Sequence, residues 1–356
     1  MRRFTVGSYL VIRVTMVSLA LTVVGCGSGD GAPVDATTVD AVSVDAAAPD
    51  APDASDADAA SPDASTPDAG AVDATPRCAD TVTYTGRLLV SLRDSGDIVE
   101  YTVAGTPVQT IAVPADGVAG DVDDNLRDLV VDECGVISAY QGTFQAVVAR
   151  RDPGTLAWSY ETMEGMSTAN NITYGGVAAA GPYVFATDMD TAGVGAPQGV
   201  VRFDTGDGEV VRFATDLDPI DVTLGLDGVL YVLTDAVVAS FDPDTLAPLG
   251  TVESAVSLRG VAVTAAGEIF GASFDGNIYR LDAAGEVADQ LDPGVGSLGD
   301  IDVAADGTIA AGARFGDVVL TTVALADSTS FDAGTGAAFV AFTDAAASAG
   351  TARARP

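Results

Sequence analysis

Carboxylates are the side chains on which any chemistry of this chain would depend. The sequence has 51 aspartate and glutamate residues and 16 arginines, with no histidine and no lysine. The lack of histidine excludes Ser-His-Asp and Cys-His nucleophiles and histidine-ligated metals. The lack of lysine excludes Schiff-base catalysis and a Walker-type phosphate loop. What remains is catalysis by carboxylates, tyrosine or arginine, or a hard cation held by oxygen ligands.

Two short patterns are similar to the first part of a calcium-binding loop. They are Asp121, Asp123 and Asn125 in GDVDDN, and Asp188 and Asp190 in DMDTAG. Alternating oxygen ligands begin such loops. However, Leu126 stands where the loop glycine would be, and neither pattern has a glutamate at its twelfth position. A weak calcium site and a solvated acidic loop are both compatible with these residues, and no other cofactor is expected.

A strand-turn-strand unit that recurs about every 40 residues must position these groups. Three copies align without gaps, at 221–233, 260–272 and 300–312, and each has two apolar segments around a turn with glycine. A period of this length with four strands per unit is typical of a β-propeller. Alternating and β-branched apolar residues predict strands throughout. The expected fold is therefore all-β.

A second hairpin completes each unit and has a polar residue at its first corner. These residues are Thr102, Asp152, Asp204, Asp242 and Asp282. An aspartate at this corner accepts hydrogen bonds from the backbone that follows it, so we interpret the set as turn formers.

About six four-stranded blades are expected, from segments 87–113, 128–161, 176–214, 221–252, 260–292 and 300–331. The first segment lacks an inner strand, and the apolar tail at 337–343 lacks a partner. Ring closure by the tail would satisfy both and remove exposed sheet edges. Seven blades result if 78–85 and the tail form a degenerate blade.

The inner strands of a propeller begin near one mouth of its central channel. Asp128, Asp221, Arg259 and Asp300 stand at or next to equivalent strand starts and could ring that mouth. They would either cap strands beside a solvated channel or bind a small ligand or cation there.

The N-terminus predicts export. Arg2, Arg3 and Arg13 precede an apolar segment, 14–25, that is too short to span a bilayer as a mature helix. The following VVGC resembles the lipobox of bacterial lipoproteins, which implies a signal peptide at 1–25 and a lipid on Cys26. The alternative is an ordinary secretory signal with an incidental cysteine. Such a lipid anchors a protein to a membrane without crossing it.

A tether is expected at 26–77, between the lipid and the folded domain at 78–356. It consists almost entirely of Asp, Ala, Pro, Val, Ser and Thr and carries eleven aspartates. Because it has little apolar surface to bury and its charges repel, we expect it to be disordered and extended. The remaining cysteines, Cys78 and Cys134, are expected to form a disulfide in an oxidising compartment.

The formal net charge of −35 limits the kinds of partner that this chain can bind. So acidic a chain repels nucleic acid and favours solubility, cations or basic partners, and it also fits a salt-rich habitat. We expect a monomer without nucleic acid.

The repeats themselves resemble known families. FDPDTLAPLGTV (241–252) is similar to YVTN-type repeats, and RRDPGTLAWSYE (150–161) is similar to quinoprotein-type (PQQ-like) repeats. The resemblance implies a propeller over about 87–343. Quinoprotein propellers repeat a tryptophan in most blades, whereas Trp158 is the only tryptophan of this chain, so their cofactor is not carried over. Gluconolactonase-like propellers bind a divalent cation around the channel, but their Glu and Asn set has no match at these strand starts.

These observations predict a lipid-anchored propeller on the bacterial outer membrane or cell surface. Its expected role is a non-catalytic binding or scaffold module for a protein, glycan or small ligand. The alternative is a divalent-cation-dependent, lactonase-like hydrolase or lyase that uses the carboxylates at the channel rim.

Overall fold

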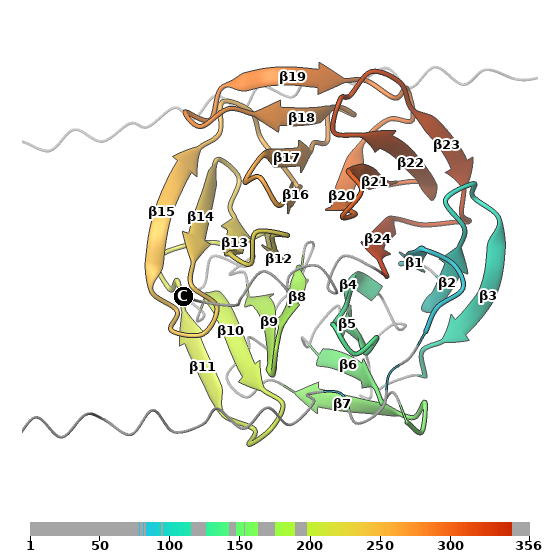
Figure 1. The fold of residues 1–356 in the computed structure, drawn as a ribbon, viewed down its shortest axis with the longest axis vertical. Helices are drawn as coiled ribbons and strands as arrows, with labels where there is room; N and C mark the ends of the chain where they lie inside the picture. Colours follow the sequence, from blue (N-terminus) through green and yellow to red (C-terminus); the bar gives the residue numbers. More distant parts are fainter. Residues whose placement is uncertain are drawn as a thin grey trace, which may run out of the picture. The chain divides into compact units, whose positions relative to one another are not determined.

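The structure describes residues 78, 81, 83–93, 95–114, 126–141, 147–152, 154–162, 175–188 and 198–343. In this computed structural model, they form six four-stranded antiparallel sheets around a central axis (Figure 1). The fold is the six-bladed β-propeller that the repeats predict, and the described part contains no helix. The signal peptide, the tether and the lipidated Cys26 lie outside the described residues.

Each blade runs from an innermost strand at the channel to an outermost strand at the periphery. Blade 1 consists, in this order, of β24 (Ala338–Phe342), β1 (Leu88–Leu92), β2 (Asp97–Tyr101) and β3 (Pro107–Ala112). Blade 2 consists of β4 (Leu126–Val131), β5 (Ile137–Gln141), β6 (Val147–Arg151) and β7 (Trp158–Thr162). Blade 3 consists of β8 (Val177–Ala180), β9 (Tyr183–Asp188), β10 (Gly199–Asp204) and β11 (Val210–Phe213).

The other three blades follow in chain order. Blade 4 consists of β12 (Asp221–Leu224), β13 (Leu230–Leu233), β14 (Val237–Phe241) and β15 (Pro248–Glu253). Blade 5 consists of β16 (Gly260–Val263), β17 (Ile269–Ala272), β18 (Ile278–Leu281) and β19 (Val287–Leu291). Blade 6 consists of β20 (Leu298–Val303), β21 (Thr308–Ala313), β22 (Asp317–Thr322) and β23 (Thr329–Asp332).

The last strand closes the ring. β24 pairs antiparallel with β1, with Leu88 opposite Phe342 and Leu92 opposite Ala338. The predicted closure is therefore confirmed, and the apolar tail completes blade 1 rather than a seventh sheet. In a ring closed in this way the sheet edges are short and protected.

The apolar core lies between neighbouring blades. Six clusters of buried side chains each combine residues from two adjacent sheets, for example Leu126 and Ile137 of blade 2 with Leu89 and Ile98 of blade 1. Because each blade buries both of its faces against its neighbours, the inner strands are almost continuously apolar. The polar residues on those strands are consequently exceptions that need an explanation.

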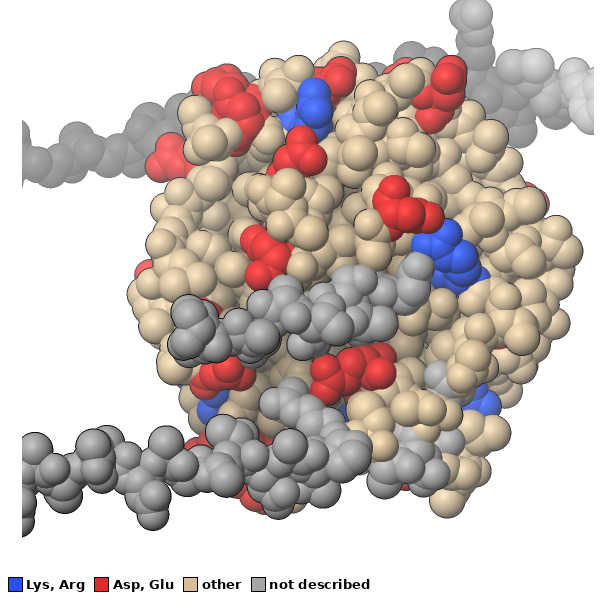
Figure 2. Space-filling view, in the orientation of Figure 1, with Lys and Arg blue, Asp and Glu red and all other residues tan. Residues whose placement is uncertain are grey.

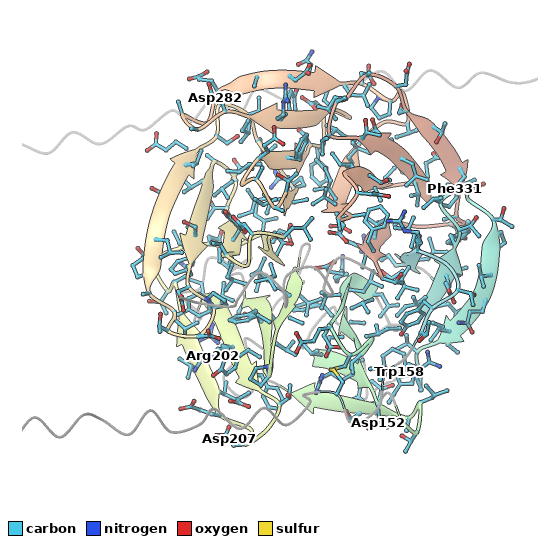
Figure 3. The ribbon with its side chains drawn as sticks, in the orientation of Figure 1. Asp152, Trp158, Arg202, Asp207, Asp282 and Phe331 are labelled. Carbon is cyan, nitrogen blue, oxygen red and sulfur yellow. A yellow bond between two sulfur atoms is a disulfide. The ribbon has the colours of Figure 1, made fainter. Side chains whose placement is uncertain are left out.

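The corner residues of the second hairpins form turns, as predicted. The Oδ1 atom of Asp242 accepts hydrogen bonds from the backbone and the hydroxyl of Thr245 at 2.9 and 3.0 Å, and Asp152 holds Thr155 in the same way. Asp204, Asp282 and Thr102 also accept bonds from the backbone that follows them. In Figure 3, Asp152, Asp207 and Asp282 lie at the periphery of the ring, away from the channel.

Candidate functional site

Three predicted rim residues lie together in the central channel. Asp128, Asp221 and Asp300, which we call the channel aspartates, stand near the starts of β4, β12 and β20, the inner strands of blades 2, 4 and 6. β-Bulges lie between Leu126 and Asp128 and between Leu298 and Asp300, where each inner strand meets its neighbour. All three aspartates are buried. We call the end at which the inner strands begin the N-terminal mouth.

Each channel aspartate joins its own blade to the next one. The Oδ1 atom of Asp221 accepts the N–H of Val222 at 2.7 Å, and its Oδ2 atom accepts the N–H of Val261 on β16 at 2.9 Å. Asp128 makes the same pair of bonds with Leu129 and Val177, both at 2.7 Å. Asp300 makes them with Ile301 at 2.8 Å and Val340 at 2.6 Å. Both oxygens of every channel aspartate therefore hold backbone N–H groups.

This arrangement recurs on alternate blades. The bridges join blade 2 to 3, blade 4 to 5 and blade 6 to 1, which gives the channel an approximate threefold pattern. Glycines face the bridging aspartates across two of the other junctions. A Cβ atom on Gly176 would lie 2.4 Å from Oδ1 of Asp221, and one on Gly260 would lie 2.8 Å from Cα of Asp300. These two junctions thus depend on close backbone approach.

Two small cavities meet at the channel aspartates. The larger, about 60 Å³, is lined by the three channel aspartates, by Asp302 and by mostly apolar residues of all six inner strands. The smaller, about 20 Å³, lies on their other side and is bordered also by Arg259 and Phe339. The larger cavity has room for a few water molecules, whereas sites for small organic ligands usually measure several hundred Å³. The described channel is too narrow for such a ligand.

Burial raises the pKa of all three channel aspartates. Burial raises the pKa of Asp300 to about 7, and the nearby charge of Asp221 adds to the effect. Burial also raises the pKa of Asp221 to about 6, partly offset by its backbone hydrogen bonds. The pKa of Asp128 is raised well above its usual range by burial and then by Asp300 and Asp221. The three groups share one low-dielectric enclosure, in which full ionisation is unfavourable.

Arg259 borders the mouth but has partners of its own. It directly precedes β16, its guanidinium lies 4.8 Å from the ring centre of Phe274, and it pairs with Asp235 at 3.2 Å. The structure thus brings all four predicted rim residues to the N-terminal mouth. It gives the three aspartates a bridging role, as in the strand-capping interpretation.

Asp302 is a bridging residue that the sequence analysis did not single out. Its Oδ1 atom accepts the N–H of Val303 and its Oδ2 atom that of Phe342, both at 2.7 Å. The junction between blades 6 and 1 therefore has two carboxylate bridges. The repeat alignment carried a signal, because DID in blade 6 has a second aspartate where blade 4 has threonine in DVT.

The predicted calcium residues lie mostly outside the described part, which excludes Asp121, Asp123, Asn125 and Asp190. Asp188 is fully buried at the end of β9, and its Oδ2 atom lies 2.8 Å from Nη2 of Arg212. An ion pair thus engages this carboxylate. Whether these loops bind calcium stays a prediction.

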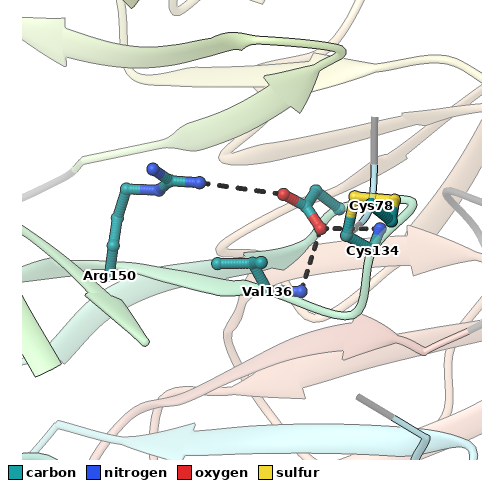
Figure 4. Close-up of a disulfide and its surroundings, with 5 residues drawn as sticks. Cys78, Cys134, Val136 and Arg150 are labelled. Carbon is teal, nitrogen blue, oxygen red and sulfur yellow. Dashed lines mark hydrogen bonds and ion pairs between the residues drawn. A yellow bond between two sulfur atoms is a disulfide. The ribbon is translucent and has the colours of Figure 1, made fainter. Parts of the chain in front are cut away.

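The predicted disulfide between Cys78 and Cys134 is present (Figure 4). It fixes the segment before β1 to the β4–β5 turn, where Oδ1 of Asp132 accepts the N–H groups of Cys134 and Val136 at 2.8 and 2.9 Å. Glu133 lies close enough to the two sulfur atoms to complete a metal-ligand set. Because both sulfurs are bonded to each other, this group does not offer thiolate ligands.

Comparisons with known proteins add little to this site. No protein-family model and no curated protein matches the chain. Solved structures do match, and one of them, described as "Streptogramin B lyase structure", is 14% identical, covers 72% of this chain and 82% of its own, and has a TM-score of 0.49. No helix with the length and hydropathy of a membrane span occurs among the residues that the structure describes. The propeller assignment rests on the strand pairing of the six sheets.

Proposed function

We propose that this chain is a lipid-anchored protein of the bacterial cell envelope whose propeller is a non-catalytic binding or scaffold module. One observation carries the proposal: the channel aspartates use both of their carboxylate oxygens to accept hydrogen bonds from backbone N–H groups. Each of the six oxygens of the channel aspartates accepts one backbone N–H group, and each aspartate thereby joins two blades. A catalytic carboxylate instead needs an oxygen aimed at a substrate, with space for that substrate.

The size of the channel supports the same conclusion. A cavity of about 60 Å³ with mostly apolar walls admits water but no sugar or lactone. Binding would then use the outer surface and the turns at the two mouths. Figure 2 shows acidic side chains spread around one face of the ring, with few basic ones. A surface of this charge favours cationic or neutral partners and disfavours nucleic acid.

The alternative function is a divalent-cation-dependent hydrolase or lyase that works at the channel mouth. The observation that favours it is the convergence of four carboxylates, the channel aspartates and Asp302, on one cavity. Thermal unfolding of the full chain with a chelator, calcium, magnesium, manganese or zinc separates the two functions. A cation bound only by the folded state raises the melting temperature in proportion to ln(1 + [L]/Kd).

We expect no ion to raise the melting temperature of the wild type more than that of Asp221→Asn. A saturable increase that the substitution abolishes would favour the enzyme. The anchor is tested separately by metabolic labelling with a radioactive fatty acid. We expect label on the wild type and none on Cys26→Ser, and equal labelling of the two chains would rule out lipidation at this cysteine.

A further inference from the structure

The channel aspartates form the boundary between the two channel cavities. Asp128, Asp221 and Asp300 line the 60 Å³ cavity on one side and the 20 Å³ cavity on the other. They come from blades 2, 4 and 6, and they are bonded to blades 3, 5 and 1, respectively. One set of three side chains therefore contacts the whole ring at a single level.

The inner strands carry few positive charges that could balance the negative charge of these carboxylates. β12 carries only Asp221, β20 carries Asp300 and Asp302, and β8, β16 and β24 have no titratable residue. The basic residues at this level are Arg127 on the β4 bulge and Arg259 before β16, and the latter is paired with Asp235. Negative charge therefore exceeds positive charge around the cavities.

Proton binding and blade contact are linked by this geometry. If all three carboxylates were ionised, their repulsion would push each one away from the others and from the N–H group that it accepts on the next strand. A proton removes one charge, and the protonated group keeps lone pairs that can still accept hydrogen bonds. The backbone N–H groups favour the ionised form, but burial outweighs them and leaves the pKa of each carboxyl raised. The buried, bridged state is consequently favoured when a proton is present.

We propose that the channel aspartates are a proton-operated clasp. With at least one proton among them, they hold blades 2 and 3, 4 and 5, and 6 and 1 together at the N-terminal mouth. Loss of the proton loosens these three junctions and leaves the glycine-lined junctions between blades 3 and 4 and between 5 and 6 closed. The raised pKa values of about 6 for Asp221 and about 7 for Asp300 place the change near neutral pH.

Hydrogen exchange of the full chain, resolved to single amides by NMR and corrected for the intrinsic effect of pH, tests the clasp. The reporters are the amides of Val177, Val261 and Val340, which the clasp holds. The control is the amide of Leu298, which bonds Ser273 across blades 5 and 6 at 3.0 Å. From mildly acidic to mildly alkaline pH, we expect the protection of the reporters to fall by roughly tenfold or more, since tenfold corresponds to one pKa unit. The protection of Leu298 should stay constant.

A matched pair of variants sharpens the test. Asp221→Asn removes one of the three charges, so the pH dependence at Val177 and Val340 should become weaker. Asp292→Asn changes an exposed aspartate that holds a turn before β20, and it should leave the wild-type profile unchanged. Equal pH dependence at all four amides, or none at the reporters, overturns the clasp. The wild-type measurement decides this even if Asp221→Asn does not fold.

Discussion

The junctions between blades are of two kinds, and the difference shows how this chain closes a ring. At junctions 2–3, 4–5 and 6–1 a buried carboxylate spans two inner strands. At junctions 3–4 and 5–6 a glycine lets the backbones approach directly. The carboxylate junction depends on polar bonds and a proton, whereas the glycine junction depends on the absence of a side chain. The two kinds should therefore fail for different reasons.

The junction between blades 1 and 2 stands apart, because Phe339 occupies the position that glycine has at the other two. Its ring packs against the apolar cluster shared by blades 1 and 2, together with Tyr84. The hydroxyl of Tyr84 donates to the carbonyl of Gly135 at 2.9 Å, beside the disulfide. This junction thus relies on apolar contact and a covalent link.

The largest effect is expected from breaking that link. Replacing both Cys78 and Cys134 by serine releases a loop with a sequence separation of 56 residues, which the chain-entropy treatment values at about 4 kcal/mol. Denaturant unfolding measures the loss, with Cys26→Ser as the control. A loss below about 1 kcal/mol would mean that the unlinked segment already holds its place or that the unfolded state gains little freedom.

The glycine junction should be broken by one methyl group. Gly176→Ala places Cβ against Oδ1 of Asp221 and the backbone of Val222, so it should cost about 3 kcal/mol through overpacking. Gly299→Ala is the matched control, since a Cβ atom there meets nothing within 4 Å. Urea unfolding of both variants gives the comparison. Equal stability of the two would contradict the tight approach at junction 3–4.

The carboxylate junctions should lose stability as the pH rises. The folded-state pKa of Asp221 is about 6, above its unfolded value, so its contribution is complete below the unfolded pKa and is lost as the pH passes through 6. About two pKa units correspond to roughly 3 kcal/mol at most. Chemical unfolding at a series of pH values should show a smaller decline for Asp221→Asn than for the wild type. Parallel curves would refute a buried, proton-binding Asp221.

Removing one bridge should cost less than blocking a glycine. Asp221→Ala leaves the N–H groups of Val222 and Val261 without this acceptor and should cost about 2 kcal/mol. Asp300→Ala should cost less, because Asp302 still holds Phe342 across the same junction. Thermal unfolding at constant pH ranks the two variants. The reverse order would mean that Asp302 does not support the junction.

The smallest effect is expected outside the channel. Arg87 of the segment before β1 pairs with Asp306 of blade 6 at 2.8 Å, with side chains 35% and 53% exposed. An exposed pair of this kind contributes about 0.5 kcal/mol and is screened by salt. Asp306→Asn should therefore change the free energy of unfolding only slightly. A cost that matches Asp300→Ala would show that surface pairs contribute as much as the channel bridges to holding blades 6 and 1 together.

The sequence predicted the ring well because repetition is a strong signal. Aligned apolar segments at a spacing of about 40 residues predicted six blades. The apolar tail at 337–343, which lacked a partner in its own unit, predicted the closure of the ring. The turn aspartates were also predictable, since Asp152 and Asp242 act through local backbone geometry. Local interactions of this kind are specified within a few residues of sequence.

The role of the channel residues was harder to predict. The sequence placed Asp128, Asp221 and Asp300 at one mouth, but their partners lie 40 to 49 residues away on the next blade. A bridge between two blades depends on how the two sheets are placed against each other. The sequence of a single repeat does not specify this placement. Asp302 was missed for the same reason. The ion pair of Asp188 with the partly exposed Arg212 was missed too, because the burial of Asp188 is a property of the assembled ring.

The strand order within blade 1 has a consequence for how the chain must be made. Its innermost strand, Ala338–Phe342, is the last strand in the described chain, while its other three strands come first. During synthesis, the earliest blade therefore waits for nearly the whole domain before it can bury its inner edge. A premature stop shortly before residue 338 would damage the beginning of the ring and leave the sixth sheet with all its strands.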